Sequence, residues 1–274
     1  MASIADLLTG VEPESRLSAE RLLAHRLGRS RSWLFAHSDY VLERSDISDI
    51  NRGLTRIRAG EPLAYLLGSW EFFSLNLKVT PDTLVPRPET EQLVEQALHL
   101  MDVDQALDVL DLGTGSGAIA LALAAERPAA RLMAVDVCPK ALTVARYNAQ
   151  TLSIANVEFV QGSWWQPLSG KAFDWVVSNP PYVVPGDIRL TARGEPDLAL
   201  FGGDDGLQAY RAIAQGLPQH LKDGGGVVLE HGLDQRQALM KLFDGQFDRL
   251  TGIDDFAGHP RVLVGEGFSR AATR

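Results

Sequence analysis

Four segments of the chain each close or follow an apolar run, and together they could bind a ligand and transfer a group from it. The first is DLGTGSG (111–117). Glycines let a backbone turn sharply and approach a ligand closely, and a helix that starts after such a turn offers unpaired N–H groups. The G-x-G-x-G spacing differs from the dinucleotide and phosphate-loop patterns, and the segment has no lysine. Because Asp111 would repel a pyrophosphate, we expect a ligand with a cationic tail.

The second and third apolar runs end in residues that suit a nucleoside. Asp136 closes the second run, where a carboxylate can accept hydrogen bonds from both ribose hydroxyls. The third run ends in GSWW (162–165), and we expect Trp164 rather than Trp165 to pack on a flat base. A nucleoside with a positive, non-phosphate tail describes S-adenosylmethionine, which we expect as the cofactor. The alternatives are a ligand-free turn at 111–117, a helix-capping Asp136 and two core tryptophans.

The segment SNPPY (178–182) ends a fourth apolar run. Two consecutive prolines cannot donate to a sheet ladder, so the strand must end here. The Asn179 side-chain carbonyl and the Pro180 backbone carbonyl can accept the two hydrogens of a planar NH2 group, and Tyr182 can cover its flat face. Such acceptors would stabilise the charge that grows on the N–H groups as a methyl group arrives. A plain strand-terminating turn is the alternative.

The hydrophobic pattern predicts the elements that position these segments. The first 65 or so residues show helical spacing and predict a small bundle of four or five helices. From Trp70 an alternating pattern predicts a hairpin, followed by a helix over 88–102. Beyond it, alternating strands and helices predict an α/β fold with a mostly parallel, doubly wound, seven-stranded sheet. The predicted strands are 106–112, 131–136, 157–162, 173–178, 225–231, 247–253 and 261–266, and the helices are 117–127, 139–150, 205–222 and 234–243.

Composition argues against several classes of function. The formal net charge is −9, so the chain is a poor default binder of nucleic-acid backbones. Cys138 is the single cysteine, which excludes an intramolecular disulfide and fits a reducing compartment. The sequence shows no signal peptide, no membrane-spanning apolar stretch and no metal-ligand spacing. We therefore expect a cytoplasmic protein with no metal, no membrane partner and no need for nucleic acid, and, without an extended apolar stripe, a monomer.

The sequence resembles the class I methyltransferases over about residues 85–266, and more closely the HemK/PrmC family of peptide chain release factor N5-glutamine methyltransferases. The segments that carry this resemblance are GEPLAYLLGSWEFFSLNLKV (60–79), TLVPRPETE (83–91), DLGTGSGAIAL (111–121), SNPPYV (178–183), EPDLALFGGDDGL (195–207) and DDFAGHPRVLVGE (254–266). The leading helical region also resembles that family's N-terminal domain. One departure is Ser163, where the family often has an acidic residue before the aromatic one and where serine would replace its polar contact with adenine.

The resemblance implies a Rossmann-like methyltransferase domain (88–274), an N-terminal helical substrate-recognition domain (1–68) and a β-hairpin linker (69–87). It implies methyl transfer from S-adenosylmethionine, with S-adenosylhomocysteine as product, to the side-chain amide of the glutamine in the Gly-Gly-Gln tip of release factors. The implied cofactor-binding residues are Asp111, Gly113, Thr114, Gly115, Ser116, Gly117, Asp136, Trp164 and Asn179. The implied substrate-binding residues are Asn179, Pro180, Pro181, Tyr182, Arg87 and Glu91, of which Asn179, Pro180 and Tyr182 are catalytic. An ion-paired or solvated surface arginine is the alternative for Arg87.

Other functions share parts of this pattern. An adenine-N6 or guanine-N2 nucleic-acid methyltransferase predicts a basic face, and basic residues concentrate only at 21–31 and 52–58, where they could also dock a protein. A ribosomal-protein glutamine is a second substrate for the same reaction. Asn179 and Tyr182 argue against a non-catalytic nucleotide-binding module, and the glycine spacing argues against a NAD-dependent dehydrogenase. Segment 195–207 is either a lid or a connector.

One histidine near the predicted site needs a separate interpretation. His231 ends the fifth strand of the predicted sheet, and its neighbour Glu230 could pair with it. We expect His231 to be a core or surface residue rather than a catalytic one.

Overall fold

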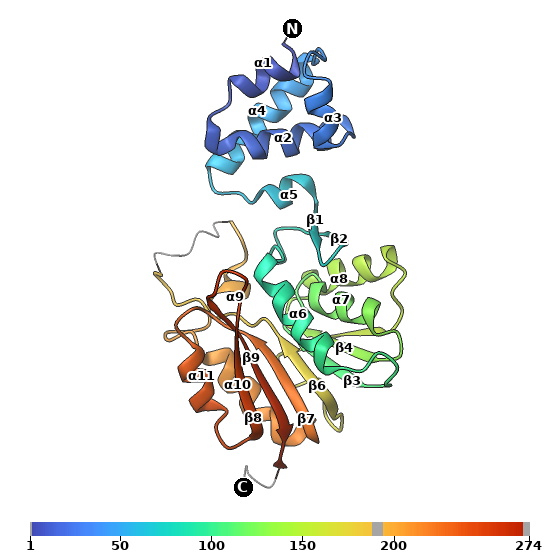
Figure 1. Ribbon diagram of the computed structural model, residues 1–274, viewed down its shortest axis with the longest axis vertical. Coiled ribbons are helices and arrows are strands. Elements are labelled where there is room, and N and C mark those ends of the chain that lie inside the picture. Colours follow the sequence, from blue (N-terminus) through green and yellow to red (C-terminus); the bar gives the residue numbers. More distant parts are fainter. Residues whose placement is uncertain (1, 188–193, 271–274) are drawn as a thin grey trace. The chain divides into compact units, whose positions relative to one another are not determined.

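The computed structural model describes residues 2–187 and 194–270 (Figure 1). The chain divides into two compact units, one made of the residues up to Ser69 together with Gly194, the other of the remaining residues from Trp70 on. Within the described ranges, none of the helices has the length and apolar character that a membrane crossing requires. The same ranges contain no group of three His, Cys, Asp or Glu side chains that could hold a metal ion.

The first unit is helical. Its helices are α1 (Ile4–Thr9), α2 (Pro13–Leu27), α3 (Arg31–Ala36), α4 (Arg44–Arg58) and α5 (Leu63–Leu67). Leu23, Leu34 and Ile50 from three of these helices are buried together in its core. Helix α2 starts at Pro13, a residue that suits the first helical position because its missing N–H would be unpaired there.

A short hairpin, β1 (Ser69–Phe72) and β2 (Leu75–Lys78), precedes the helix α6 (Pro88–Leu100). Phe72 and Leu77 of the hairpin are buried in the same core cluster as α6. The turn between the strands takes a left-handed backbone at Phe73, with φ 47°. The Glu91 carboxylate accepts a hydrogen bond from the Phe73 backbone N–H at 2.8 Å, so α6 stabilises the hairpin turn.

A seven-stranded sheet forms the centre of the second unit, in the order β5-β4-β3-β6-β7-β9-β8. Its strands are β3 (Asp108–Leu112), β4 (Arg131–Asp136), β5 (Val157–Gln161), β6 (Phe173–Ser178), β7 (Leu221–Glu230), β8 (Phe247–Asp254) and β9 (Pro260–Phe268). The five strands from β5 to β7 pair in parallel, and β9 runs antiparallel to both its neighbours. This confirms the predicted mostly parallel, seven-stranded fold.

Helices cover both faces of the sheet (Figure 1). Successive strand residues alternate between two buried clusters: Val109 lies with α6 and α7 (Ala118–Glu126), and Leu110 with α10 (Gln208–His220) and α11 (Arg236–Leu242). The remaining helices are α8 (Pro139–Thr151), which contributes Ala149 to the first cluster, and the short α9 (Asp197–Leu200). This alternation is what the period of two along a strand requires when both faces are buried.

Strand β7 starts earlier than the sequence indicates. The sequence predicted a strand over 225–231, but β7 already starts at Leu221, which pairs with Phe173 of β6. A Cβ on Gly226 would lie 2.3 Å from the Trp175 ring. Glycine therefore makes room here for a large side chain on the neighbouring strand.

Candidate functional site

The candidate site lies at the carboxyl ends of the central strands, where the strand order reverses. Strand β3 pairs with β4 on one side and with β6 on the other. The Ser178 hydroxyl at the end of β6 donates to the Leu112 carbonyl at the end of β3, at 2.6 Å. The glycine-rich segment 111–117 and the Asn179–Tyr182 segment therefore leave the sheet from neighbouring strand ends, the place where open α/β sheets bind ligands.

Three glycines shape the loop between β3 and α7. Gly113, Gly115 and Gly117 all take left-handed backbone angles, with φ of 76°, 56° and 85°, which other residues adopt only with strain. A Cβ on Gly117 would also lie 3.2 Å from the Ala145 Cβ of α8. The loop thus has the sharp turn that the sequence predicted, and Gly117 also lets it pack closely against α8.

Asp111 is a fully buried carboxylate beneath this loop. One of its oxygens accepts a hydrogen bond from the Thr114 hydroxyl at 2.6 Å, and the other has no hydrogen-bond partner among the described residues. Burial raises the pKa of Asp111 to about 7. A buried, half-satisfied carboxylate favours a cation nearby, and in this respect the residues present fit S-adenosylmethionine.

Asp136 supports the glycine loop from the end of β4. Its two carboxylate oxygens accept hydrogen bonds from the Gly115 and Cys138 backbone N–H groups, each at 2.8 Å. Burial raises its pKa, although these hydrogen bonds oppose the shift. Because each carboxylate oxygen has a second lone pair, Asp136 can still accept from ribose hydroxyls, and that role stays a prediction.

The two tryptophans after β5 have different surroundings. The Trp165 indole N–H donates to the Ala212 carbonyl at 2.9 Å, and its ring stacks on His220 with a centroid distance of 5.0 Å. Trp165 therefore joins the loop after β5 to α10. Trp164 is half-buried and has a left-handed backbone, with φ 49°. Its contact with a base stays a prediction.

A chain of hydrogen bonds connects the Asn179–Tyr182 segment to α6 and β7. The Asn179 amide nitrogen donates to the Thr90 hydroxyl at 3.1 Å. The Thr90 hydroxyl in turn lies 2.6 Å from one oxygen of the Glu230 carboxylate, and the Tyr182 hydroxyl lies 3.1 Å from the other. Glu230 is 1% exposed. Sequence reasoning missed Thr90 and Glu230 as site residues, although Thr90 stands next to Glu91 and Glu230 ends a buried strand.

The backbone of the same segment is held by the chain around 201–206 and by Gln235. The Gln235 side-chain amide donates to the Tyr182 carbonyl at 3.0 Å. A Cβ on Gly202 would lie 2.6 Å from the Pro181 carbonyl oxygen, and one on Gly206 would lie 2.4 Å from that of Tyr182. The second half of segment 195–207, the expected lid or connector, thus packs on the Asn179–Tyr182 segment. Residues 188–193 lie outside the described chain.

The two other predicted substrate residues have partners within the protein. Arg87 forms an ion pair with Glu195, whose side chain is buried and also accepts from the Val85 backbone N–H at 2.8 Å. Glu91 bonds the Phe73 backbone in the hairpin turn. Both side chains are therefore bonded within the protein, and a direct contact of either with substrate stays a prediction.

His231 is fully buried at the end of β7. Its Nδ1 atom lies 2.8 Å from the Gly232 carbonyl, and burial lowers its pKa. The Glu230 side chain, which the sequence suggested as its partner, bonds Thr90 and Tyr182 instead. His231 is a core residue.

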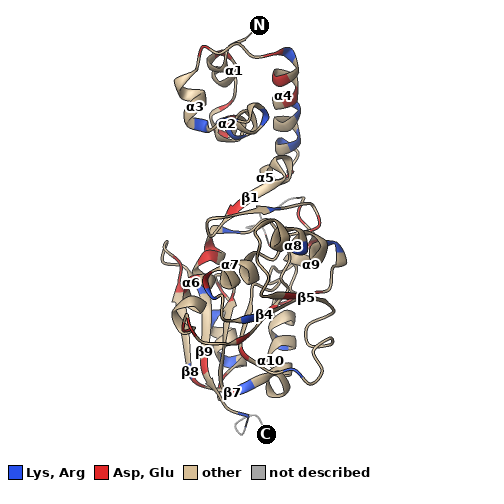
Figure 2. Ribbon diagram, turned by 90° about the vertical axis from the view of Figure 1, so that its right-hand side faces the viewer, with Lys and Arg blue, Asp and Glu red and all other residues tan. Residues whose placement is uncertain are grey.

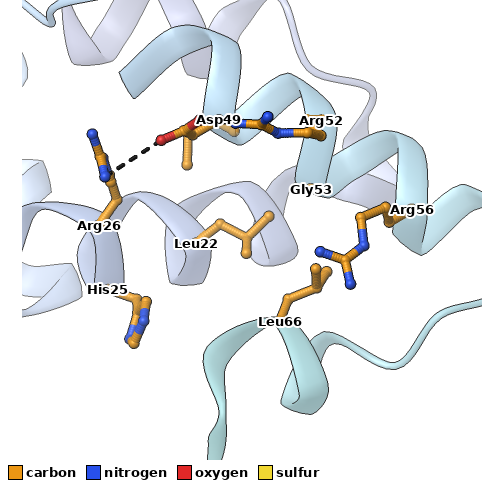
Figure 3. Close-up of a pocket in the computed structure, with 9 residues that line it drawn as sticks. Leu22, His25, Arg26, Asp49, Arg52, Gly53, Arg56 and Leu66 are labelled. Atoms are coloured by element: carbon orange, nitrogen blue, oxygen red, sulfur yellow. Dashed lines mark hydrogen bonds and ion pairs between the residues drawn. The ribbon is translucent and has the colours of Figure 1, made fainter. Parts of the chain in front are cut away.

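Most arginines of the helical unit are paired with acidic residues of the same unit. Arg26 forms ion pairs with Asp46 at 2.9 Å and with Asp49 at 3.4 Å, the latter shown in Figure 3. Arg56 is paired with Glu61. Helix α4 carries both signs of charge along its length (Figure 2). This mixture gives no support to a basic face for nucleic acid.

Comparison with known proteins identifies matching domain families and relatives of this chain. Residues 2–68 match the PrmC N-terminal domain, and residues 91–194 match the methyltransferase small domain. The release factor glutamine methyltransferase of Vibrio cholerae is 45% identical over 91% of this chain and 89% of its own length. The protein of the same name from Escherichia coli K12 is 43% identical over 91% of each chain.

Solved structures share the fold. A methyltransferase from Pyrococcus furiosus aligns with a TM-score of 0.56 at 20% identity, over 80% of this chain and 99% of its own. The 16S rRNA N2 G1207 methyltransferase of Thermus thermophilus aligns with a TM-score of 0.54 at 20% identity, over 72% of this chain and 49% of its own. Given the full-length relatives, the chain belongs to the release factor glutamine methyltransferase family.

Proposed function

We propose that this chain transfers the methyl group of S-adenosylmethionine to the side-chain amide nitrogen of the glutamine in the Gly-Gly-Gln motif of peptide chain release factors. The observation that carries the proposal is the Ser178–Leu112 hydrogen bond, because it joins the ends of the strands from which the donor loop and the amide-binding segment leave. Relatives of 43% and 45% identity that carry the name of this activity support it. The protein acts in the cytoplasm as a monomer, with residues 1–68 as the substrate-recognition domain.

The donor side would hold the nucleoside and its cationic tail. When bound, S-adenosylmethionine supplies an electrophilic methyl group on a sulfonium centre. The backbone of loop 113–117 would enclose its tail, the unpaired oxygen of Asp111 would stabilise the positive charge, and Asp136 would accept from the ribose. Trp164 would pack on the base.

The acceptor side would hold the glutamine amide. The Asn179 Oδ1 atom and the Pro180 carbonyl accept the two N–H groups, which favours a nitrogen that can attack the methyl carbon. The methylated nitrogen would be acidic and would release one of these protons to water, with the donor left as a neutral thioether, so no strong base would be needed beforehand. Tyr182 covers the amide. Burial and the Glu230 carboxylate raise the Tyr182 pKa, so it remains a neutral phenol and is not the base.

The test supplies methyl-labelled donor and the purified chain with a release factor, with the same factor carrying Gln→Ala at its tip, and with RNA and DNA. We expect label only on the unaltered factor and a mass increase of one methylene on the tip peptide. Label on nucleic acid, or label kept by the Gln→Ala factor, contradicts the proposal. Label on a ribosomal protein in a parallel reaction would instead identify the alternative glutamine substrate.

A further inference from the structure

We infer that Glu230 and Thr90 are positioning residues for methyl transfer, because together they decide which atom of the Asn179 side chain faces the substrate amide. This inference rests on the proposed function and deepens it. Neither residue needs to touch the substrate or the donor. They act through hydrogen bonds to Asn179 and Tyr182, the two side chains that the proposed reaction uses to hold the glutamine.

The Thr90 hydroxyl has a single hydrogen to donate. A carboxylate has no hydrogen and can only accept, so the 2.6 Å contact between Thr90 Oγ1 and Glu230 Oε2 uses the Thr90 hydrogen. The Thr90 oxygen is then left with lone pairs alone. Whatever bonds to it next must donate.

The planar amide of Asn179 has one donating and one accepting branch. Its NH2 group can donate and its Oδ1 can only accept, so the Thr90 oxygen selects the NH2 group, which lies 3.1 Å away. The Asn179 Oδ1 atom therefore occupies the other branch of the amide, and it has no hydrogen bond within the described chain. That free acceptor is what an incoming substrate NH2 group requires.

The carboxylate of Glu230 also holds Tyr182. The second Glu230 oxygen accepts from the Tyr182 hydroxyl at 3.1 Å. One buried acceptor thus fixes both ends of the Asn179–Tyr182 segment. Replacing the Glu230 carboxylate with an amide, which has one accepting and one donating branch, must disturb either Asn179 or Tyr182.

Some groups around Glu230 raise its pKa and others lower it. Burial raises its pKa, and the nearby Glu89 adds to that shift, whereas Arg261 and the two hydroxyl hydrogen bonds oppose it. A protonated Glu230 could donate to Thr90, whose own hydrogen would then be free to turn toward Asn179. The amide of Asn179 would be reversed, and its NH2 group would face the substrate NH2 group.

The first experiment uses Glu230→Gln, which keeps the size of the side chain. If the new NH2 group faces Thr90, it reverses Asn179, and if it faces Tyr182, that hydroxyl loses its acceptor. We expect kcat with release factor to fall by about tenfold or more, as small displacements of reacting groups allow, while the Kd for S-adenosylmethionine stays within about twofold.

Tyr182→Phe and Tyr210→Phe form a matched pair around the same residue. The Tyr210 hydroxyl donates to the Glu230 backbone carbonyl at 2.7 Å, whereas the Tyr182 hydroxyl bonds its carboxylate. Both changes remove one buried hydroxyl and both lower the free energy of unfolding. We expect only Tyr182→Phe to lower kcat.

The second experiment separates the Thr90 hydroxyl from its methyl group. Thr90→Val keeps the shape and removes the bond to Asn179, and we expect the same loss in kcat as for Glu230→Gln. Thr90→Ser restores the hydroxyl and should restore kcat to within a few-fold of the unaltered enzyme. The double variant Thr90→Val with Glu230→Gln should lose little more than either alone, because both act through one network.

The outcomes separate this inference from the proposed function. An unaltered chain that does not methylate the release factor would refute the proposed function. An unaltered chain that does, together with Thr90→Val and Glu230→Gln variants that keep their kcat, would refute only the positioning role. A loss of kcat that Thr90→Ser does not restore, or that Tyr210→Phe shares, would also refute it, because it would show a general packing defect.

Discussion

The donor half and the acceptor half of the site are built in different ways. In the donor half, Thr114 bonds Asp111 three residues away, and Gly115 bonds Asp136 on the neighbouring strand. In the acceptor half, Asn179 bonds a residue 89 positions away, and Thr90 bonds one 140 positions away. The donor half is mainly a backbone shape, and the acceptor half is a network of side chains from β6, α6 and β7.

Two buried carboxylates show what this difference means for function. Asp111 leaves one oxygen without a partner in the described chain, whereas both oxygens of Glu230 bond hydroxyls. An unsatisfied buried group is costly unless a ligand completes it, whereas a satisfied one rigidifies its surroundings. We therefore expect changes in the donor half to act on cofactor affinity, and changes in the acceptor half to act on turnover.

The largest expected effect is in the acceptor half. Asn179→Ala removes the proposed side-chain acceptor for the glutamine amide, and we expect kcat to fall by about 100-fold or more, the scale of losing one transition-state hydrogen bond. Donor affinity should change far less. Single-turnover methylation and calorimetric titration with S-adenosylmethionine measure the two quantities. Equal losses in both would mean that Asn179 serves only the cofactor.

The next effect is in the donor half. Asp136→Ala removes the proposed ribose acceptor, and we expect the Kd for S-adenosylmethionine to rise by about 10- to 100-fold, the range for a hydrogen bond to a charged group. At saturating donor, kcat should stay near that of the unaltered chain. Unchanged donor affinity would count against the ribose role.

The pH dependence of donor binding tests Asp111. Its pKa rises from 3.8 to about 7 in the folded chain. Between these values the folded carboxyl holds a proton that the unfolded one has lost, so this group's contribution to the free energy of unfolding falls as pH rises. A cationic donor needs the charged carboxylate, so its affinity should fall by about tenfold per pH unit below pH 7.

Asp111→Asn is the control for that titration. It keeps the shape of the side chain and removes its charge, so donor affinity should be lower and should vary less between pH 5.5 and pH 7.5. Any slope that remains would be assigned to Asp136, whose pKa is also raised. A slope identical to that of the unaltered chain would exclude Asp111 as its source.

The smallest expected effect compares two asparagines that bridge backbone groups. The Asn148 side chain accepts from the Lys78 N–H and donates to the carbonyls of Lys78 and of Ser116 in the glycine loop. The Asn156 side chain instead donates to carbonyls in the last turn of α7 and just after it. Each change to Ala should lower the free energy of unfolding by about 1–3 kcal/mol. Only Asn148→Ala should also weaken donor binding, by about two- to fivefold, and equal Kd values would show that the loop does not depend on it.

Much of the fold and of the donor half could be predicted because its signals are local. The alternation of strand and helix patterns predicted the sheet. The positive φ angles of Gly113, Gly115 and Gly117 are a property of glycine itself. Two prolines end β6 because they have no N–H. Boundaries were less certain, as β7 shows, because pairing with a neighbouring strand extended it through a glycine-rich segment.

By itself, the sequence determined the glycine loop, the stop after β6 and the family to which both belong. Only the tertiary structure decided that Thr90 and Glu230 meet beside Asn179. It also decided that Arg87 pairs with Glu195 and that Glu91 bonds the Phe73 backbone. The reason is physical: backbone angles follow from a residue and its neighbours. A side chain's hydrogen-bond partner follows instead from which strands and helices lie side by side, and those positions can be far apart in the sequence.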